Sequence, residues 1–170
     1  MDYFISDLHN MDSNIISYMQ RPYTDVYDMR DKMIDMWNST VEPSDTVYYL
    51  GDIGDAEILN ELDGNIVFVC GNHDNLDELE CEFDDITFYD RPFFLSREII
   101  LSHEPIPCIP PEAPFCNIHG HLHKYSYGIG QDWSSGLRYC NVSIENCGYE
   151  LVTLEDIENK LQHKLSCELF

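Results

Sequence analysis

Short hydrophobic runs alternate with segments of helical periodicity in the first half of the chain. Tyr3–Ser6, Thr46–Leu50 and Asn65–Cys70 are rich in β-branched and aromatic residues, which predicts three buried strands. Aspartate or glycine follows each run directly and ends it. Between the first two runs, hydrophobic residues recur at near-helical spacing and predict an amphipathic helix over Asp25–Ser39. The apolar face of that helix consists of Val26, Met29, Met33, Met36 and Trp37.

The rest of the chain continues the alternation, with one interruption. Pro105–Pro114 carries five prolines, which predicts a loop. Further strands are expected over Ile86–Tyr89, Phe93–Leu95, Glu98–Ser102, Asn117–His119, Tyr139–Ile144 and Tyr149–Thr153. Further helices are expected over Asn14–Gln20 (with Ser13 as a cap), Ala56–Leu62, Leu76–Phe83 and Leu154–Lys164.

The order of these elements predicts the fold class. Strands outnumber helices, and the most polar segments stand where strands end. This arrangement is typical of an α/β sandwich with its functional site at the carboxyl ends of strands. No repeat or linker divides the 170 residues, so we expect one domain over residues 1–170.

Charge and cysteine content restrict the partners and the compartment. The formal net charge is −23, from 9 basic and 32 acidic residues, and such a surface repels long nucleic acids. Seven cysteines without any C-x-x-C pair predict reduced thiols in a cytoplasmic protein. The first residues lack a basic segment and a long apolar run, so we expect no signal peptide. No stretch has the apolar length of a membrane span, so no membrane partner is expected.

Five polar segments carry the candidate chemistry, and five of the seven histidines fall within them. Residues two apart in an extended chain point to the same side, so Asp7 and His9 can converge on one ion, as can His121 and His123. The five segments are Asp7–His9, Gly51–Asp55, Gly71–Asp74, Ser102–Glu104 and Gly120–His123.

The donor set of these segments predicts a two-metal site. It offers seven nitrogen and oxygen donors and no thiolate: Asp7, His9, Asp52, Asn72, His103, His121 and His123. Such a set suits Mn²⁺, Fe, Co²⁺, Ni²⁺ or Zn²⁺ better than Ca²⁺ or a structural zinc. Seven ligands are too many for one ion that also binds solvent. Two ions sharing Asp52 as a bridge therefore fit the set best.

In order, the motifs read D-x-H, G-D-x-x-D, G-N-H-D, H and G-H-x-H, and this set resembles the calcineurin-like metallophosphoesterase superfamily. The chain is also similar to a narrower group, the compact single-domain bacterial and phage phosphoesterases. That similarity rests on Asn14–Ile16, Arg21–Tyr23, Trp37–Asn38, Cys140–Ser143 and Leu154–Ile157. The resemblance implies a four-layer α-β-β-α sandwich of two mixed sheets flanked by helices.

The resemblance also assigns ligands by matching positions, with Asp52 as the bridge between two metals. The first metal would be held by Asp7, His9 and His123. The second metal would be held by Asn72, His103 and His121. Mn²⁺ is the first choice of ion.

The activity that the resemblance implies is hydrolysis of a small phosphodiester or phosphomonoester by a metal-bridging hydroxide. His73 would be the acid beside the leaving group, and Asp55 would orient His73. Protein phosphatases of the superfamily carry arginine after this second aspartate, whereas Ala56 stands here, so we do not expect a protein substrate.

Several alternatives remain open at this level. Arg21 either contacts a substrate phosphate through its guanidinium or pairs with a nearby acid such as Asp25. The main alternative to an enzyme is a catalytically silent binding scaffold of the same fold, which should have broken motifs, whereas every ligand position is filled here. The least favoured alternative is a dinuclear hydrolase that acts on a carbonyl substrate.

Overall fold

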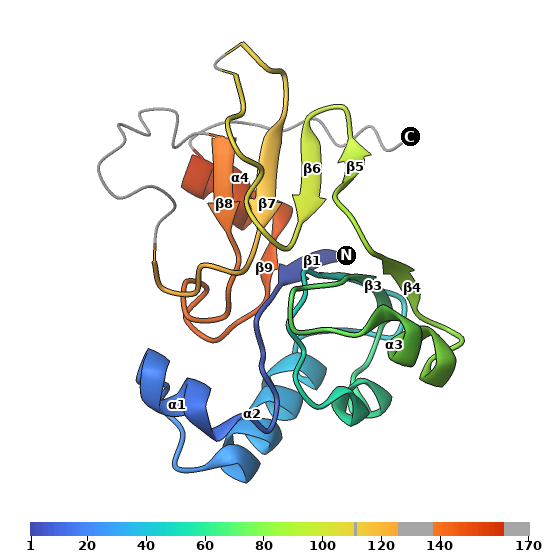
Figure 1. Ribbon diagram of the computed structural model, residues 1–170, viewed down its shortest axis with the longest axis vertical. Helices are drawn as coiled ribbons and strands as arrows, with labels where there is room; N and C mark the ends of the chain where they lie inside the picture. Colours follow the sequence, from blue (N-terminus) through green and yellow to red (C-terminus); the bar gives the residue numbers. More distant parts are fainter. Residues whose placement is uncertain (111, 126–137, 162–170) are drawn as a thin grey trace.

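A computed structural model describes residues 1–110, 112–125 and 138–161, and its strands form two sheets (Figure 1). The first sheet has the strand order β4-β3-β2-β1-β9, in which β9 is antiparallel to β1 and the other pairs are parallel. Its register pairs Ile5 with Tyr49 and Tyr49 with Phe68, so the carboxyl ends of three parallel strands are level. The strands are β1 (Asp2–Ile5), β2 (Thr46–Tyr49), β3 (Asn65–Val69), β4 (Thr87–Tyr89) and β9 (Val152–Thr153).

The second sheet has the order β5-β6-β7-β8. Its first pair is antiparallel and the other two pairs are parallel, so both sheets are mixed. An isolated bridge between Ser6 and Ser143 joins the chain after β1 to the chain after β8, where the two sheets approach each other. The strands are β5 (Phe93–Ser96), β6 (Ile99–Ser102), β7 (Cys116–His119) and β8 (Tyr139–Asn141).

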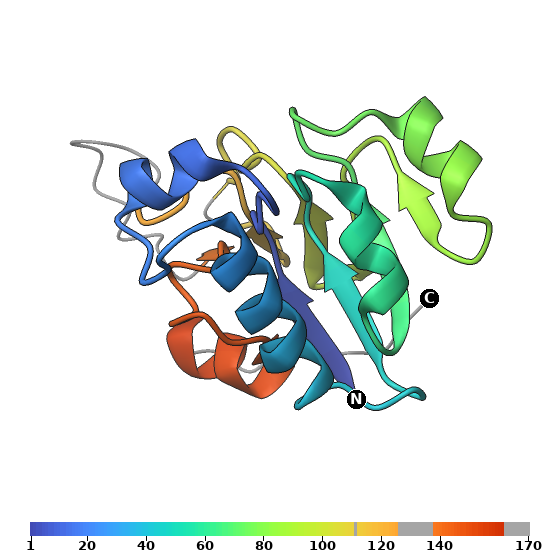
Figure 2. The same ribbon diagram turned by 90° about the horizontal axis from the view of Figure 1, so that it is seen from below.

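Helices cover the outer face of the first sheet. Figure 2 shows α2 and η1 lying along this face. The amphipathic spacing of α2 places Met29, Met33 and Trp37 in a fully buried row against the sheet. Trp37 also donates its indole N–H to the carbonyl of Asp63 at 2.8 Å. The helices on this side are α1 (Ser13–Met19), α2 (Val26–Asn38), the 3₁₀ helix η1 (Ala56–Glu61) and α3 (Leu76–Glu82).

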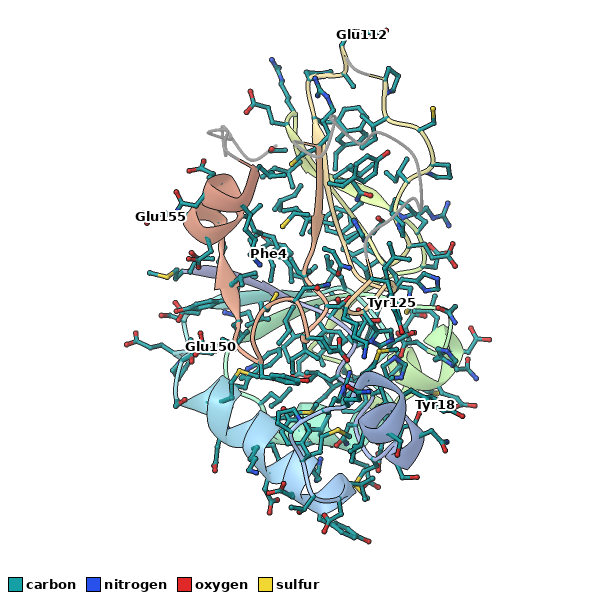
Figure 3. All side chains as sticks on the ribbon, turned by 90° about the vertical axis from the view of Figure 1, so that its left-hand side faces the viewer. Phe4, Tyr18, Glu112, Tyr125, Glu150 and Glu155 are labelled. Carbon is teal, nitrogen blue, oxygen red and sulfur yellow. The ribbon has the colours of Figure 1, made fainter. Side chains whose placement is uncertain are left out.

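A second hydrophobic core fills the space between the sheets. Phe4 of β1 stacks on Tyr48 of β2 with ring centroids 5.2 Å apart, and Figure 3 shows Phe4 in this interior. Helix α4 (Leu154–Leu161) buries Ile157 and Leu161 in the same core and packs against β1, β8 and β9.

The outer face of the second sheet is covered by a loop. The amide of Ile106 donates to the side-chain oxygen of Asn117, and the hydroxyl of Tyr139 donates to the carbonyl of Ile106. Phe115 packs edge-on against Phe94 of β5. In the described part of the chain, residues 104–110 and 112–115 therefore provide the outer layer here, where the four-layer expectation placed helices.

The predicted α/β sandwich of two mixed sheets is confirmed, and most element boundaries agree within a residue or two. Asp12 rather than Ser13 caps α1, because its carboxylate accepts from the amide of Asn14. The expected strand over Tyr139–Ile144 ends at Asn141, and residues 162–164 of the last expected helix lie outside the described residues. Among the described helices, none combines the length and apolar character that crossing a membrane requires.

Candidate metal centre

The predicted ligands follow the carboxyl ends of five strands that meet at one edge of the sandwich. Asp7 follows β1, and Asp52 follows β2. Asn72 follows β3, and His103 follows β6 directly. His121 and His123 follow β7, so the parallel arrangement of these strands brings all five segments together.

Asp7, His9 and His123 form the first ligand group, called the Asp7 cluster below. One ligand atom from each lies within 4.8 Å of the others. The Nε2 atoms of His9 and His123 lie 4.0 and 3.9 Å from Asp7 Oδ1. The serine before Asp7 donates its hydroxyl to Asp7 Oδ2 at 2.6 Å, and the amide of His121 donates to the same carboxylate. These bonds fix the carboxylate toward the two imidazoles.

Asp52, His103 and His121 form the second group, called the Asp52 cluster below, with the same mutual distance limit of 4.8 Å. The side-chain oxygen of Asn72 lies 3.1 Å from His103 Nε2 and 2.9 Å from His121 Nδ1. Asn72 therefore completes a set of four donors around one point.

Asp52 stands between the two clusters. Its Oδ2 lies 3.5 Å from His9 Nε2 and 3.4 Å from His103 Nε2, so one carboxylate oxygen faces a histidine from each cluster. Its other oxygen accepts the amide of His73 at 2.9 Å, which holds the carboxylate in this orientation. The sequence-based expectation of a shared Asp52 agrees with this geometry.

The backbone around these ligands adopts an uncommon conformation. Five of the predicted ligands have positive φ, a region that residues other than glycine rarely occupy. They are Asp7 (60°), His9 (47°), Asp52 (59°), His121 (69°) and His123 (49°). Such strain persists only where the surrounding structure enforces it, and it concentrates at functional sites.

Two glycines allow the carboxylates to approach the neighbouring backbone. A Cβ on Gly71 would overlap Asp52 Oδ1, and a Cβ on Gly120 would lie 2.5 Å from Asp7 Oδ2. Any side chain at either position would displace the carboxylate. The glycines of G-N-H-D and G-H-x-H are therefore required by packing around the ligands.

Two of the imidazoles are oriented by protein acceptors. His103 donates Nδ1–H to the carbonyl of Leu50 at 2.8 Å, which leaves Nε2 facing Asp52. His123 places Nδ1 3.2 Å from both oxygens of Glu145, which leaves Nε2 facing Asp7. Partners of this type fix the ring and raise the basicity of the coordinating nitrogen in metal sites.

The electrostatics of both clusters favour the binding of cations. Burial would raise the pKa of the Asp52 carboxyl, but the hydrogen bond and charge of His103 hold it at about 2. Burial likewise opposes protonation of His103, yet Asp52 and Asp7 raise its pKa to about 9. Burial lowers the pKa of His9, whose Nε2 has no hydrogen-bond partner. A buried nitrogen without a partner is costly, and a metal ion at the Asp7 cluster would satisfy it. The residues present therefore fit the two ions that the sequence predicts.

His73 lies beside the clusters rather than within them. Its ring packs edge-on against His9 with centroids 5.5 Å apart, and its side chain is exposed. Asp55 lines the same cavity as His73, but its carboxylate accepts the amide of Glu57 and caps η1. Asp74 instead binds the turn together, because its oxygens accept the amides of Asp52, Ile53 and Gly71. The role of Asp55 as the residue that orients His73 stays a prediction.

Arg21 requires a correction, because its side chain is fully buried and its donors are used within the fold. The guanidinium donates to the carbonyls of Asp7 and Leu8 at 2.7 and 2.5 Å and pairs with Glu145. It is therefore not placed to bind a substrate phosphate, and its acidic partner is not Asp25, which caps α2. Sequence reasoning missed Glu145, for which no motif or periodicity gave a signal.

Fold and site together define the class: an α/β sandwich protein with paired His/Asp clusters that could hold metal ions. Comparison with protein-family models gives no match. The chain is 33% identical to the uncharacterized protein MJ1445 of Methanocaldococcus jannaschii over 161 residues, which cover 90% of this chain and 86% of MJ1445. It therefore belongs to the same family as MJ1445.

A solved structure shares the architecture. The crystal structure of AQ665 from Aquifex aeolicus, described as a protein of unknown function, matches with a TM-score of 0.70 and 26% sequence identity. The match covers 94% of this chain and 98% of AQ665. The sandwich is therefore shared across nearly the full length of both chains.

Proposed function

We propose that this protein is a metal-dependent phosphoesterase that uses two divalent ions to hydrolyse a small phosphodiester or phosphomonoester. The observation that carries the proposal is the position of Asp52 Oδ2, 3.5 Å from a histidine of one cluster and 3.4 Å from a histidine of the other. A carboxylate shared in this way is the arrangement that two-metal hydrolases use.

The ligand chemistry sets the class of ion. The first ion would be held by Asp7, His9, His123 and the shared Asp52, and the second by Asp52, Asn72, His103 and His121. Mixed imidazole, carboxylate and amide donors favour first-row divalent ions, with Mn²⁺ first and Fe, Co²⁺, Ni²⁺ or Zn²⁺ as alternatives. When bound, such ions supply Lewis acidity, which acidifies water and attracts phosphoryl oxygens.

The chain itself supplies the proton transfer to the leaving group. His73 is exposed and packs against His9, a ligand of the first cluster. Its backbone amide is fixed by Asp52 Oδ1, so the ring is held beside the site by the same carboxylate that joins the clusters. His73 donates a proton to the departing oxygen, which is the task of a general acid.

The surroundings favour a small substrate and a reducing compartment. The net charge of −23 disfavours long polyanions, so the substrate is a small ester rather than nucleic acid. The six cysteines that the structure describes are all free, in keeping with the cytoplasm.

Hydrolysis of bis(p-nitrophenyl) phosphate and p-nitrophenyl phosphate, with and without Mn²⁺, tests the proposal. Wild-type protein should show metal-dependent turnover that Asp52→Asn abolishes. Asp31→Asn removes the same charge from the exposed face of α2 and should retain full activity. Two bound ions without turnover on any ester would favour the silent scaffold, and protein that binds no ions would contradict both the metal site and the enzyme.

A further inference from the structure

A cavity of about 360 Å³ opens directly beside the Asp52 cluster. It lies between the turn after β3, the residues before β5 and the loop that follows β6. Asn72 and His103 line it, so two of the proposed ligands form part of its wall. If a phosphate were bound at the metal site, a group attached to it could therefore extend into this cavity while the phosphate stayed in place.

The walls of the cavity are mainly apolar. The apolar lining residues are Val69, Cys70, Pro92, Pro105, Ile106 and Pro107. The charged side chains of Asp90, Arg91 and Glu104 also line the cavity. Apolar side chains make up much of this wall, and such a wall favours an apolar occupant.

Several polar groups of the cavity already have partners within the protein. The guanidinium of Arg91 binds both carboxylate oxygens of Asp90 at 2.7 and 2.9 Å. The hydroxyl of Ser102 donates to the carbonyl of Glu104, and the amide of Ile106 donates to Asn117. An apolar group bound here would leave each of these polar groups with its protein partner.

His73 lies outside this cavity. It lines a separate hollow of about 330 Å³ together with Asp55, Asp74 and Glu78. Since the leaving oxygen must be near its proton donor, the departing group belongs on the His73 side. The cavity beside Asn72 is then free for the ester group that stays on phosphorus.

Building on the proposed function, we propose that this cavity, called the retained-group pocket, binds the ester group that phosphorus keeps, which makes the substrate a phosphodiester. The retained group is apolar and small, because the volume lies near the lower end of small-ligand sites, and an aromatic ring fits within it. A phosphomonoester carries no such group and would leave the pocket unfilled.

The reaction balances as a hydrolysis of one ester bond. Oxygen from water forms a bond to phosphorus, and the bond from phosphorus to the leaving oxygen breaks. One proton of the water ends on the leaving oxygen through His73, and the other remains on the phosphate or enters solvent. The retained ester bond is unchanged, so the products are an alcohol and a phosphomonoester.

Two diesters with the same leaving group test the pocket by kinetics. Bis(p-nitrophenyl) phosphate retains an aromatic ring, whereas methyl p-nitrophenyl phosphate retains only a methyl group. We expect a KM about tenfold lower for the aromatic diester, from burial of one ring. Equal KM values for the two diesters would overturn the proposal.

Variants of Ile106 test whether the preference for the aromatic diester arises in the retained-group pocket. Ile106→Trp fills the pocket, and Ile106→Ala enlarges it as a second variant should the tryptophan disturb folding. Both should raise the KM of the aromatic diester about tenfold and leave that of the methyl diester unchanged. Glu112→Trp places the same side chain at the far tip of this loop (Figure 3) and should change neither constant.

Ligand binding separates failure of the pocket from failure of the proposed function. Calorimetry with Mn²⁺-loaded protein compares diphenyl phosphate with dimethyl phosphate, and needs no turnover. Tighter binding of diphenyl phosphate that Ile106→Trp abolishes would support the pocket even in an inactive protein. Hydrolysis of both diesters with no preference in binding would keep the enzyme and reject the pocket.

Discussion

Arg21 and Glu145 form a buried ion pair behind the Asp7 cluster, with Arg21 Nη2 2.7 Å from Glu145 Oε1. The two side chains are 0% and 4% exposed. Arg21 also holds the carbonyls of Asp7 and Leu8, while Glu145 accepts from His123. The pair therefore connects the backbone of one predicted ligand to the imidazole of another.

Loss of the Glu145 charge should weaken one metal site selectively. Glu145→Gln removes the carboxylate that orients His123, and changes of this kind typically cost about 10- to 100-fold in metal affinity. We expect isothermal titration with Mn²⁺ to show one weakened site and one unchanged site. Glu150→Gln, at an exposed acid nearby in sequence, serves as the control. Two unchanged affinities in Glu145→Gln would refute this positioning role.

Removal of Arg21 should destabilise the metal-free protein. Arg21→Met leaves Glu145 buried without its partner, and breaking a buried pair costs about 3–5 kcal/mol. Arg30→Met removes an arginine whose partner Glu61 is 53% exposed, so it should cost under about 1 kcal/mol. Urea unfolding of both variants, monitored by circular dichroism, gives the comparison. Similar losses for the two variants would show that the Arg21 pair is no more important than a surface contact.

A methyl group at Gly71 should abolish the shared carboxylate geometry. The Cβ of Gly71→Ala would overlap Asp52 Oδ1, so Asp52 has to turn away from His9 and His103. We expect loss of at least one bound ion by elemental analysis. Gly148→Ala is the matched control, because its Cβ meets nothing within 4 Å although its φ of 68° is strained. Its metal content should stay at the wild-type value, with a stability loss of about 1 kcal/mol.

The strand pattern predicted where the candidate ligands lie, because each ligand stands within a few residues of a hydrophobic run in the sequence. Each predicted ligand follows a hydrophobic run, and parallel pairing brings the ends of such runs to one edge. The expectation that Asp52 is shared between two ions came from the number of ligands and from the family resemblance, and it stays a prediction. The sequence could not predict that residues 104–110 and 112–115 cover the second sheet, since prolines indicate a loop but not the surface on which the loop packs.

The polar contacts between residues far apart in the chain could not be predicted from the sequence. Arg21 and Glu145 are 124 positions apart, and neither belongs to the five polar segments that carry the predicted ligands. Asp55 and Asp74 are both motif aspartates, and only loop conformation decides which backbone groups each one meets. Gly54, with φ of 80°, turns the chain so that Asp55 caps η1.

Metal affinity should rise with pH, because an ion at the Asp52 cluster must replace a proton on His103. The pKa of His103 is raised to about 9 in the metal-free protein, so its imidazole is protonated at neutral pH and cannot coordinate. Below that pKa, loss of one proton on binding predicts a gain of about tenfold in affinity per pH unit, levelling off above about pH 9.

The interaction of His103 with Asp52 should also make the stability of the metal-free protein depend on pH. A raised histidine pKa stabilises the fold fully below the unfolded value of 6.5, and that contribution disappears as the pH rises through about 9. Calorimetric titration of Mn²⁺ in two buffers of different ionisation enthalpy counts the released protons at pH 7.5, and His103→Gln should release one fewer than wild type. If both proteins release the same number of protons, His103 is already neutral before the metal binds. The neighbouring Asp52 carboxylate would then not be enough to keep His103 protonated.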